Sequence, residues 1–181
     1  MKLKNVIKHF NLITHHKWVV FKLCCKIGEP WRGIVHDISK YSPTEFWESA
    51  NYYVGDHSPI TEAKKNKGYS EAWLHHKGRN RHHVEYWVDH NAPEVTPIIP
   101  YPYAAEMICD KLAAGMIYEG KKWTKEFELS YWEEREKNIV EMNPKMKDFI
   151  TAVMTEVAIQ GIDKTLTKKN IKQLYKKYCE S

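Results

Sequence analysis

Residues 5–30 read NVIKHFNLITHHKWVVFKLCCKIGEP, and this stretch decides the fold class. At about 100° per residue, a set of apolar side chains falls within about 60° of His16, as on an amphipathic helix with one buried face. The set is Leu12, Ile13, Val19, Val20, Leu23 and Ile27. Gly28 suits the position after a helix and Pro30 cannot continue one, so a helix is predicted from Asn5 to Ile27.

Helical periodicity continues along most of the chain, without strand-like alternation or hairpin turn signals. Ser42-Pro43-Thr44-Glu45 reads as a capping box, and Ser70 is a second predicted N-cap. A polar loop is expected at 55–68 and a proline-rich connection at 91–102. The further predicted helices are 33–40, 43–53, 70–87, 102–117, 124–142, 144–159 and 167–178. The sequence therefore predicts a single all-α domain over residues 1–181, with seven or eight helices.

Composition excludes several classes of protein. With 43% hydrophobic and 28% charged residues, the chain is neither collagen-like nor disordered. No apolar stretch approaches the roughly 20 residues of a membrane span, and the first residues lack a signal-peptide pattern. The four cysteines form no CxxC pair. We therefore expect a cytoplasmic protein without a disulfide framework or a zinc finger.

The segment 161–181 holds six lysines and two acidic residues, which accounts for most of the net charge of +5. A solvated helix face is the favoured interpretation of this basic tail, and a contact with nucleic acid or an anionic surface is the alternative. Because the rest of the chain is nearly neutral, nucleic acid is not expected as the main partner. The high aromatic content leaves a homodimer open.

Histidine and aspartate recur on predicted apolar faces. His16 lies at the centre of the first helix's buried face, and the adjacent His36-Asp37 pair can offer a nitrogen and an oxygen to one metal ion. In a continuous helix over 70–87, His76 and His83 share a face, whereas His75 and His82 lie on a wetter one. Asp110 shares its face with apolar residues and with Glu106 one turn back.

Each of these residues has an alternative structural explanation. A core histidine can bond to a backbone carbonyl, and a buried aspartate can pair with a cation. Their convergence from separate helices instead predicts a metal site, although each histidine pair leaves open which member is the ligand. Imidazole and carboxylate without thiolate suit one or two Mn, Fe, Zn, Ni or Co ions, with Asp37 shared in the second case. The predicted ligands are His16, His36, Asp37, His76, His83 and Asp110.

The order of these residues resembles the HD-domain superfamily of metal-dependent phosphohydrolases, over roughly Asn5 to Gly120. His36-Asp37-Ile38-Ser39-Lys40 resembles its HDxxK variant. The stretches 76–87 and 106–110 also resemble a family of uncharacterised bacterial and phage proteins, and this second resemblance implies no particular activity. The superfamily resemblance implies an all-α core with a metal site between helices, and C-terminal helices over 121–181 would follow that core.

The resemblance also implies hydrolysis of a nucleotide or a related phosphate ester by metal-activated water. Asp37 and Lys40 are the expected catalytic residues, with Lys40 facing the substrate phosphate. Arg79 and Asn80 are expected to bind the substrate together with Lys40. Solvated side chains are the alternative for Lys40 and Arg79. A di-iron oxygenase on the same scaffold and a non-catalytic, His-rich helical protein with a basic tail for binding are the other hypotheses.

Overall fold

The computed structural model describes residues 3–92, 96–136 and 141–181, and within them every regular element is helical. The all-α prediction is confirmed, with ten α-helices in these residues rather than seven or eight. The α-helices are α1 (Leu3–Lys26), α2 (Pro30–Val35), α3 (Pro43–Asn51), α4 (Pro59–Lys67), α5 (Glu71–Lys77), α6 (Tyr101–Glu119), α7 (Phe127–Glu136), α8 (Pro144–Gln160), α9 (Ile162–Thr165) and α10 (Lys168–Cys179). The 3₁₀ helices are η1 (Ile38–Tyr41), η2 (Val84–Tyr86) and η3 (Gly120–Lys122).

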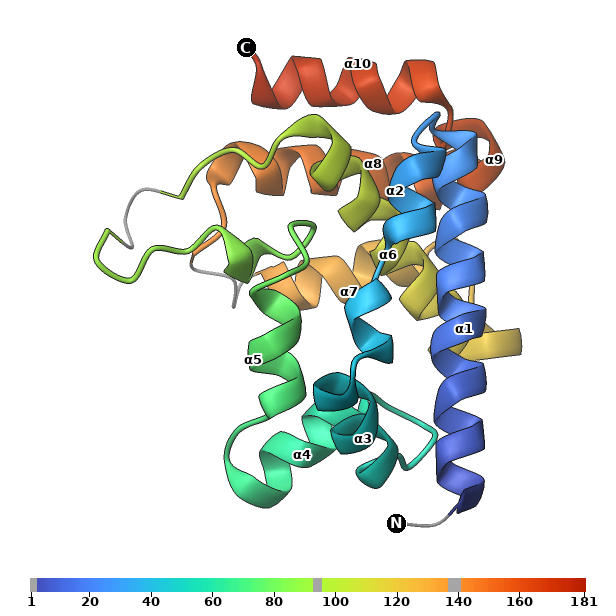
Figure 1. The fold of residues 1–181 in the computed structure, drawn as a ribbon. Helices are drawn as coiled ribbons and strands as arrows, with labels where there is room; N and C mark the ends of the chain where they lie inside the picture. The colour runs from blue at the N-terminus through green and yellow to red at the C-terminus, as the bar shows by residue number, and fades with distance from the viewer. Residues whose placement is uncertain (1–2, 93–95, 137–140) are drawn as a thin grey trace.

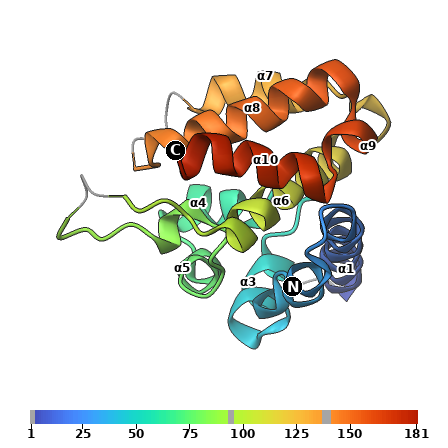
Figure 2. The same ribbon diagram turned by 90° about the horizontal axis from the view of Figure 1, so that it is seen from above.

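The helix α6 lies in the middle of the molecule and contacts both of its halves (Figures 1 and 2). On one side α1 and α2 pack against it, with α3, α4 and α5 beyond them. On the other side lie α7, α8 and α10, and α8 contacts both α7 and α10. The side chains of α6 therefore reach two different interiors.

The predicted starts and ends of several helices are confirmed. The helix α1 ends at Lys26, and Gly28 follows in the left-handed region with φ of 76°. Ser42 and Ser70 accept hydrogen bonds from the backbone N–H groups of Glu45 and Trp73, as N-cap residues do. These caps satisfy N–H groups that would otherwise lack a partner at the first turns of α3 and α5.

Three predicted segments are wrong. The predicted helix 33–40 is instead α2 followed by η1, because the chain breaks at His36 and Asp37 between them. The expected loop 55–68 contains α4, which starts with a proline at its first position. The helix predicted over 70–87 ends at Lys77, where turns replace it as far as His83. Part of the predicted helix 124–142 lies outside the described residues.

The C-terminal half holds a dense apolar core, whose fully buried side chains include Phe149, Ile150, Val153 and Met154 on α8. The helix α10 lays its apolar face on this core. Its lysines face outward, as the interpretation of a solvated helix face predicts. Among the described helices, none has the length and apolar character needed to cross a membrane.

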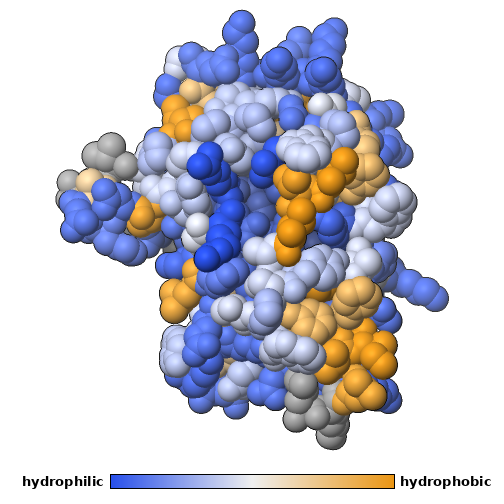
Figure 3. Space-filling view, viewed as in Figure 1, coloured by the Kyte–Doolittle hydropathy of each residue, from blue (hydrophilic) through white to orange (hydrophobic). Residues whose placement is uncertain are grey.

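Most of the face seen in Figure 3 is hydrophilic, and hydrophobic residues gather on it toward the N-terminal end of α1. Exposed apolar side chains on that end are Leu3, Ile7 and Phe10.

Candidate metal centre

A break in the chain brings His36 and Asp37 to the same place. Adjacent residues in a helix point about 100° apart, so they could not both face one point. Here α2 ends at Val35, and Asp37 adopts a left-handed conformation with φ of 51°. The Nζ of Lys17, on α1, donates hydrogen bonds at 2.6 Å to the carbonyl oxygens of Ile34 and His36. These bonds hold the last carbonyls of α2 where the helix stops.

The first group of candidate ligands is His16, His36, Asp37 and Asp110, from α1, the break and α6. The Nε2 of His16 lies 2.9 Å from Asp110 Oδ1 and 3.4 Å from His36 Nε2. The Nε2 of His36 lies 3.2 Å from Asp37 Oδ2 and 3.4 Å from Asp110 Oδ1. Four side chains from three parts of the chain thus direct one atom each toward a common point.

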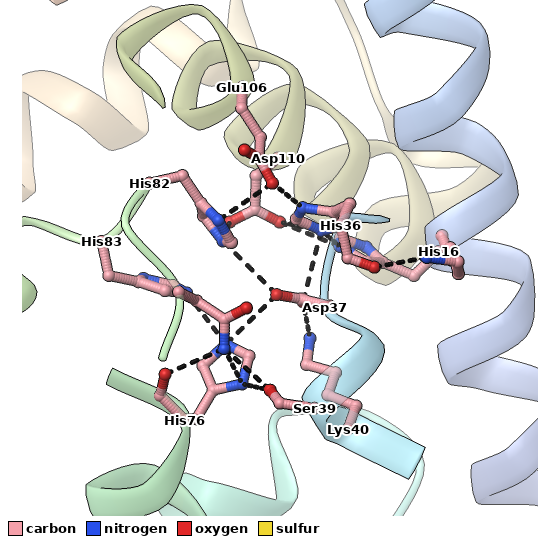
Figure 4. A network of polar contacts seen from close by, with 12 residues as sticks. His16, His36, Asp37, Ser39, Lys40, His76, His82, His83, Glu106 and Asp110 are labelled. Atoms are coloured by element: carbon pink, nitrogen blue, oxygen red, sulfur yellow. Dashed lines mark hydrogen bonds and ion pairs between the residues drawn. The ribbon is translucent and has the colours of Figure 1, made fainter. Parts of the chain in front are cut away.

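The second group is Asp37, His76, His82 and His83. The Nε2 atoms of His76 and His83 lie 3.0 Å apart. The Nε2 atoms of His76 and His82 both lie 3.4 Å from Asp37 Oδ1. Asp37 therefore belongs to both groups, with Oδ2 facing the first and Oδ1 facing the second (Figure 4). We call these seven residues the His–Asp centre.

These distances match the spacing of ligands around a metal ion. At a metal–ligand distance of about 2.1 Å, neighbouring ligand atoms lie about 3.0 Å apart in octahedral geometry and about 3.4 Å apart in tetrahedral geometry. The contacts within each group run from 2.9 to 3.4 Å. The two groups could hold one ion each, with the carboxylate of Asp37 between them.

Buried polar atoms without hydrogen bonds support this fit. Among the described residues, both oxygens of Asp37 and both nitrogens of His82 are buried and lack a hydrogen bond of good geometry. Asp37 has ion-pair contacts, but a buried polar atom that is left unsatisfied still costs about 1–3 kcal/mol. Cations bound at the two groups would supply the missing partners of Asp37 and of His82 Nε2. The donor set of imidazole and carboxylate suits first-row transition metals.

Glu106, on α6, orients two of the histidines. Its Oε1 accepts a hydrogen bond from His36 Nδ1 at 2.9 Å and lies 3.1 Å from His82 Nδ1. With the Nδ1 proton directed at this carboxylate, Nε2 of His36 is free to face the centre. Arg32 donates from Nε to Glu106 Oε2 at 2.7 Å, and its guanidinium stacks on Tyr103. Glu106, His36 and His82 also form a third group that could hold a metal ion. Because Glu106 contacts the Nδ1 atoms, whereas the Nε2 atoms face Asp37, we assign Glu106 the role of orienting the two histidines.

Glu45 has the same part on the other side of the centre. Its two oxygens accept from His76 Nδ1 at 2.7 Å and from His75 Nδ1 at 2.6 Å. The capping-box prediction is therefore confirmed only in part. Ser42 caps α3, while the carboxylate of Glu45 is directed to the histidines.

The charges of the centre are strongly coupled. Burial raises the pKa of Asp37, but His36 and Lys40 outweigh it and hold that pKa well below its usual range. Burial likewise raises the pKa of Asp110, and hydrogen bonds to His16 and His36 outweigh it. Both carboxylates are therefore ionised near neutral pH, the state in which they bind cations.

Burial also acts on the histidines. It lowers the pKa values of His16 and His83, which keeps their imidazoles neutral. For His36, the carboxylates of Asp37, Asp110 and Glu106 outweigh burial and raise the pKa well above its usual value. A neutral imidazole is the form that coordinates a metal.

The predicted substrate-binding residues lie in different places. Lys40 lies beside the centre, with Nζ 2.7 Å from Asp37 Oδ2. Asn80 is buried, and its Nδ2 donates at 2.8 Å to Ser39 Oγ and to the carbonyl of His76. Arg79 is exposed and donates to the carbonyl of His75. The structure gives Asn80 and Arg79 internal contacts, and neither lines any of the three cavities that reach Asp110 in the described part of the chain.

All six predicted ligands meet in the centre, and sequence reasoning missed the seventh, His82. The expectation that His82 lies on a wetter face is wrong, since it is 1% exposed. That expectation assumed one helix over 70–87, whereas the turn after α5 directs both His82 and His83 inward. Glu106 carried a signal, because it lies one turn before Asp110 on the same face. Glu45 gave no signal beyond its capping position.

Comparison with known proteins gives a family but no activity. No curated protein matches the chain, and no solved structure does. Residues 5–156 match a protein family described as a family of unknown function, DUF5662. The matched segment contains every residue of the His–Asp centre together with Glu45 and Glu106. Since it also spans most of the sequence, the chain belongs to the DUF5662 family.

Proposed function

We propose that this protein is a metal-dependent phosphohydrolase that acts on a nucleotide or a related phosphate ester. The observation that carries the proposal is the pair of four-residue groups that share Asp37, one carboxylate oxygen to each group. The centre would hold one or two divalent metal ions, and its imidazole and carboxylate ligands suit Mn, Fe, Zn, Ni or Co. Divalent ions lower the pKa of a bound water and polarise phosphoryl oxygens.

The chain's own residues fit this reaction. Hydrolysis breaks the bond between phosphorus and the ester oxygen and forms a bond from phosphorus to the water oxygen. The departing alcohol oxygen takes up one proton that the water releases. Lys40 would neutralise charge on the phosphoryl group, because its ammonium lies at the edge of the centre beside Asp37.

The positive charge of Lys40 beside the centre also favours hydrolysis over oxygenation as the reaction. Burial lowers the pKa of Lys40, but Asp37 and Asp110 outweigh it and raise that pKa above its usual value. The side chain therefore keeps its positive charge, which suits an anionic phosphate. Activation of dioxygen has no comparable need for an ammonium group.

The test begins with metal content. Protein purified without a His-tag or chelator should contain about one to two equivalents of transition metal by elemental analysis. The His36→Ala, Asp37→Ala double variant should contain none. His15→Ala is the matched control for His16→Ala, because His15 is exposed beside the buried His16. Of these two single variants, we expect His16→Ala to lose metal and His15→Ala to retain it.

A screen of phosphate esters under the metal found would then test hydrolysis. Retained hydrolysis in a folded Asp37→Ala variant would overturn the proposed function. Turnover that instead needs dioxygen with bound iron would favour the oxygenase. If neither the wild type nor the His36→Ala, Asp37→Ala double variant binds metal, even after anaerobic addition of Mn, Fe, Co, Ni and Zn, the histidines are structural.

A further inference from the structure

A small cavity adjoins the His–Asp centre. It has a volume of about 200 Å³ and is lined by Lys40 and by ligands from both groups. Those ligands are His16, Asp110, His76 and His83. Two larger cavities, of about 440 and 540 Å³, also reach Asp110, but Lys40 lines neither of them. A phosphoryl group that contacts both ligand groups and Lys40 would therefore present its ester substituent to the small cavity.

The remaining walls of this cavity are mostly apolar. Leu12 and Ile13 come from α1, Trp73 from α5 and Ile117 from α6. Away from the centre, hydroxyl groups reach this cavity only from Ser49, Ser58 and Tyr118 among the described residues. A charged or heavily hydroxylated substituent would therefore lose more hydrogen bonds to water than it regains here, which costs free energy. Glu45 also lines the cavity, but its oxygens already accept from His75 and His76.

The volume limits the size of the substituent. Sites for drug-sized ligands usually measure about 300–1,000 Å³, whereas an apolar cavity of about 150 Å³ holds benzene. A cavity of about 200 Å³ therefore accepts a group built on one ring and is too small for a nucleoside.

His9 adds one polar group to the cavity wall. Its side chain is buried, and its Nδ1 has no hydrogen-bond partner among the described residues. Burial, with Lys40 nearby, lowers the pKa of His9 to about 4, so the imidazole is neutral. A neutral imidazole can exchange one hydrogen bond with a hydroxyl or carbonyl group without adding charge.

We infer that the substrate is a phosphate monoester whose alcohol part is compact, uncharged and largely apolar, about the size of one ring. This inference rests on the proposed function, and it narrows the substrate class from nucleotides and related phosphate esters to small organic phosphate monoesters. The 540 Å³ cavity shares Ser58, Ala114 and Tyr118 with the small one, and a longer substituent would have to extend into it.

The experiment compares three esters of primary or methyl alcohols on the metal-loaded protein, so that the leaving groups are alike: benzyl phosphate, methyl phosphate and adenosine 5′-monophosphate. We expect kcat/KM for benzyl phosphate to exceed the other two by at least about tenfold. Ala114→Leu, which adds volume to the cavity wall, should remove that advantage and leave methyl phosphate nearly unchanged. Ala152→Leu on α8 is the matched control, since both alanines are partly buried and Ala152 lines none of these cavities.

Binding provides a second readout that does not depend on turnover. Calorimetric titration with phenylphosphonate and methylphosphonate should show the same preference, and Ala114→Leu should abolish it. If no ester is hydrolysed but this preference holds, the proposed function fails and the inference about the cavity stands. A preference for adenosine 5′-monophosphate, or an equal loss for benzyl and methyl phosphate in Ala114→Leu, would overturn the inference and leave hydrolysis intact.

Discussion

Two buried glutamates, one in each half of the molecule, show opposite electrostatic behaviour. Glu106 lies among the histidines on the α1 side of α6, and Glu128 lies on α7, against the other side of α6. Burial raises the pKa of both. For Glu106, the hydrogen bond from His36 and the close imidazole of His82 outweigh burial and lower the pKa to about 2.

For Glu128, burial prevails and raises the pKa to about 7, although Trp123 Nε1 donates a hydrogen bond to it at 2.8 Å. The comparison shows that polar partners decide the pKa of the buried carboxyl group in one interior, whereas burial decides it in the other. Around the His–Asp centre, charges are retained because each has several partners. On the α8 side, apolar packing dominates, and a carboxyl group with one hydrogen bond keeps its proton up to about pH 7. We therefore expect stability to depend mainly on the apolar half and metal binding on the polar half.

The largest expected effect is on the apolar half. Phe149→Ala removes a fully buried ring from α8 and should lower the free energy of unfolding by about 3–5 kcal/mol. Phe10→Ala, at a side chain that is 47% exposed, is the control and should cost less than about 1 kcal/mol. Urea denaturation measures both values. Equal losses would contradict the assignment of the core to this half.

Metal removal should come next and should act on the polar half. Ions held only by the native state at about 1,000 times their Kd stabilise it by about 4 kcal/mol, and a chelator should remove that. Calorimetry would follow Tm, and hydrogen exchange would locate the change. Amides of α2 and α5 should lose protection, while those of α8 keep theirs. An equal loss of amide protection in both halves would contradict the assignment of metal binding to the polar half.

Glu106→Gln should weaken metal binding by about 10- to 100-fold. The amide has one accepting oxygen in place of the two carboxylate oxygens that accept from His36 and Arg32, so His36 and the neighbouring His82 are less well oriented. Competition with a chromophoric chelator measures the affinity. Glu133→Gln on α7 changes an exposed glutamate in the same way and should have no effect. Unchanged affinity in Glu106→Gln would show that the ligands need no such support.

The smallest effect concerns pH and Glu128. The folded-state pKa of about 7 exceeds the usual 4.5, so the wild type loses stability as pH rises from about 4.5 to 7. Glu128→Gln keeps an acceptor for Trp123 and removes this loss. The variant should match the wild type near pH 4 and be the more stable of the two at pH 8, by thermal denaturation. A variant that is less stable at pH 8 would mean that the carboxylate has a partner in this half.

Much of the fold could be predicted because helix signals are local. Gly28, Ser42 and Ser70 mark helix ends through their own backbone and hydrogen-bonding chemistry, and the structure confirms each of them. The missed helix α4 has a low apolar content, so its periodicity was weak. Its proline start at Pro59 was the remaining signal.

The site was predicted less completely, because face arguments assume unbroken helices. They placed His16 correctly, since α1 is continuous through it. They failed for His82, which lies after the end of α5. The pairing of Glu106 with Arg32, and that of Glu45 with His76, joins residues 74 and 31 positions apart in the sequence. No periodicity within one helix could indicate such contacts.

The left-handed residue at Asp37 has a consequence for motion. Most ligands of the centre are carried by different parts of the chain, so their separations change whenever those parts move relative to one another. His36 and Asp37 are joined by a single peptide unit, and the carboxylate of Asp37 faces both groups. His36 and Asp37 therefore stay next to each other when the helices move relative to one another. The two contact points that Asp37 offers to the groups are the oxygens of one carboxylate, so their separation is set by covalent geometry and does not change when the helices move.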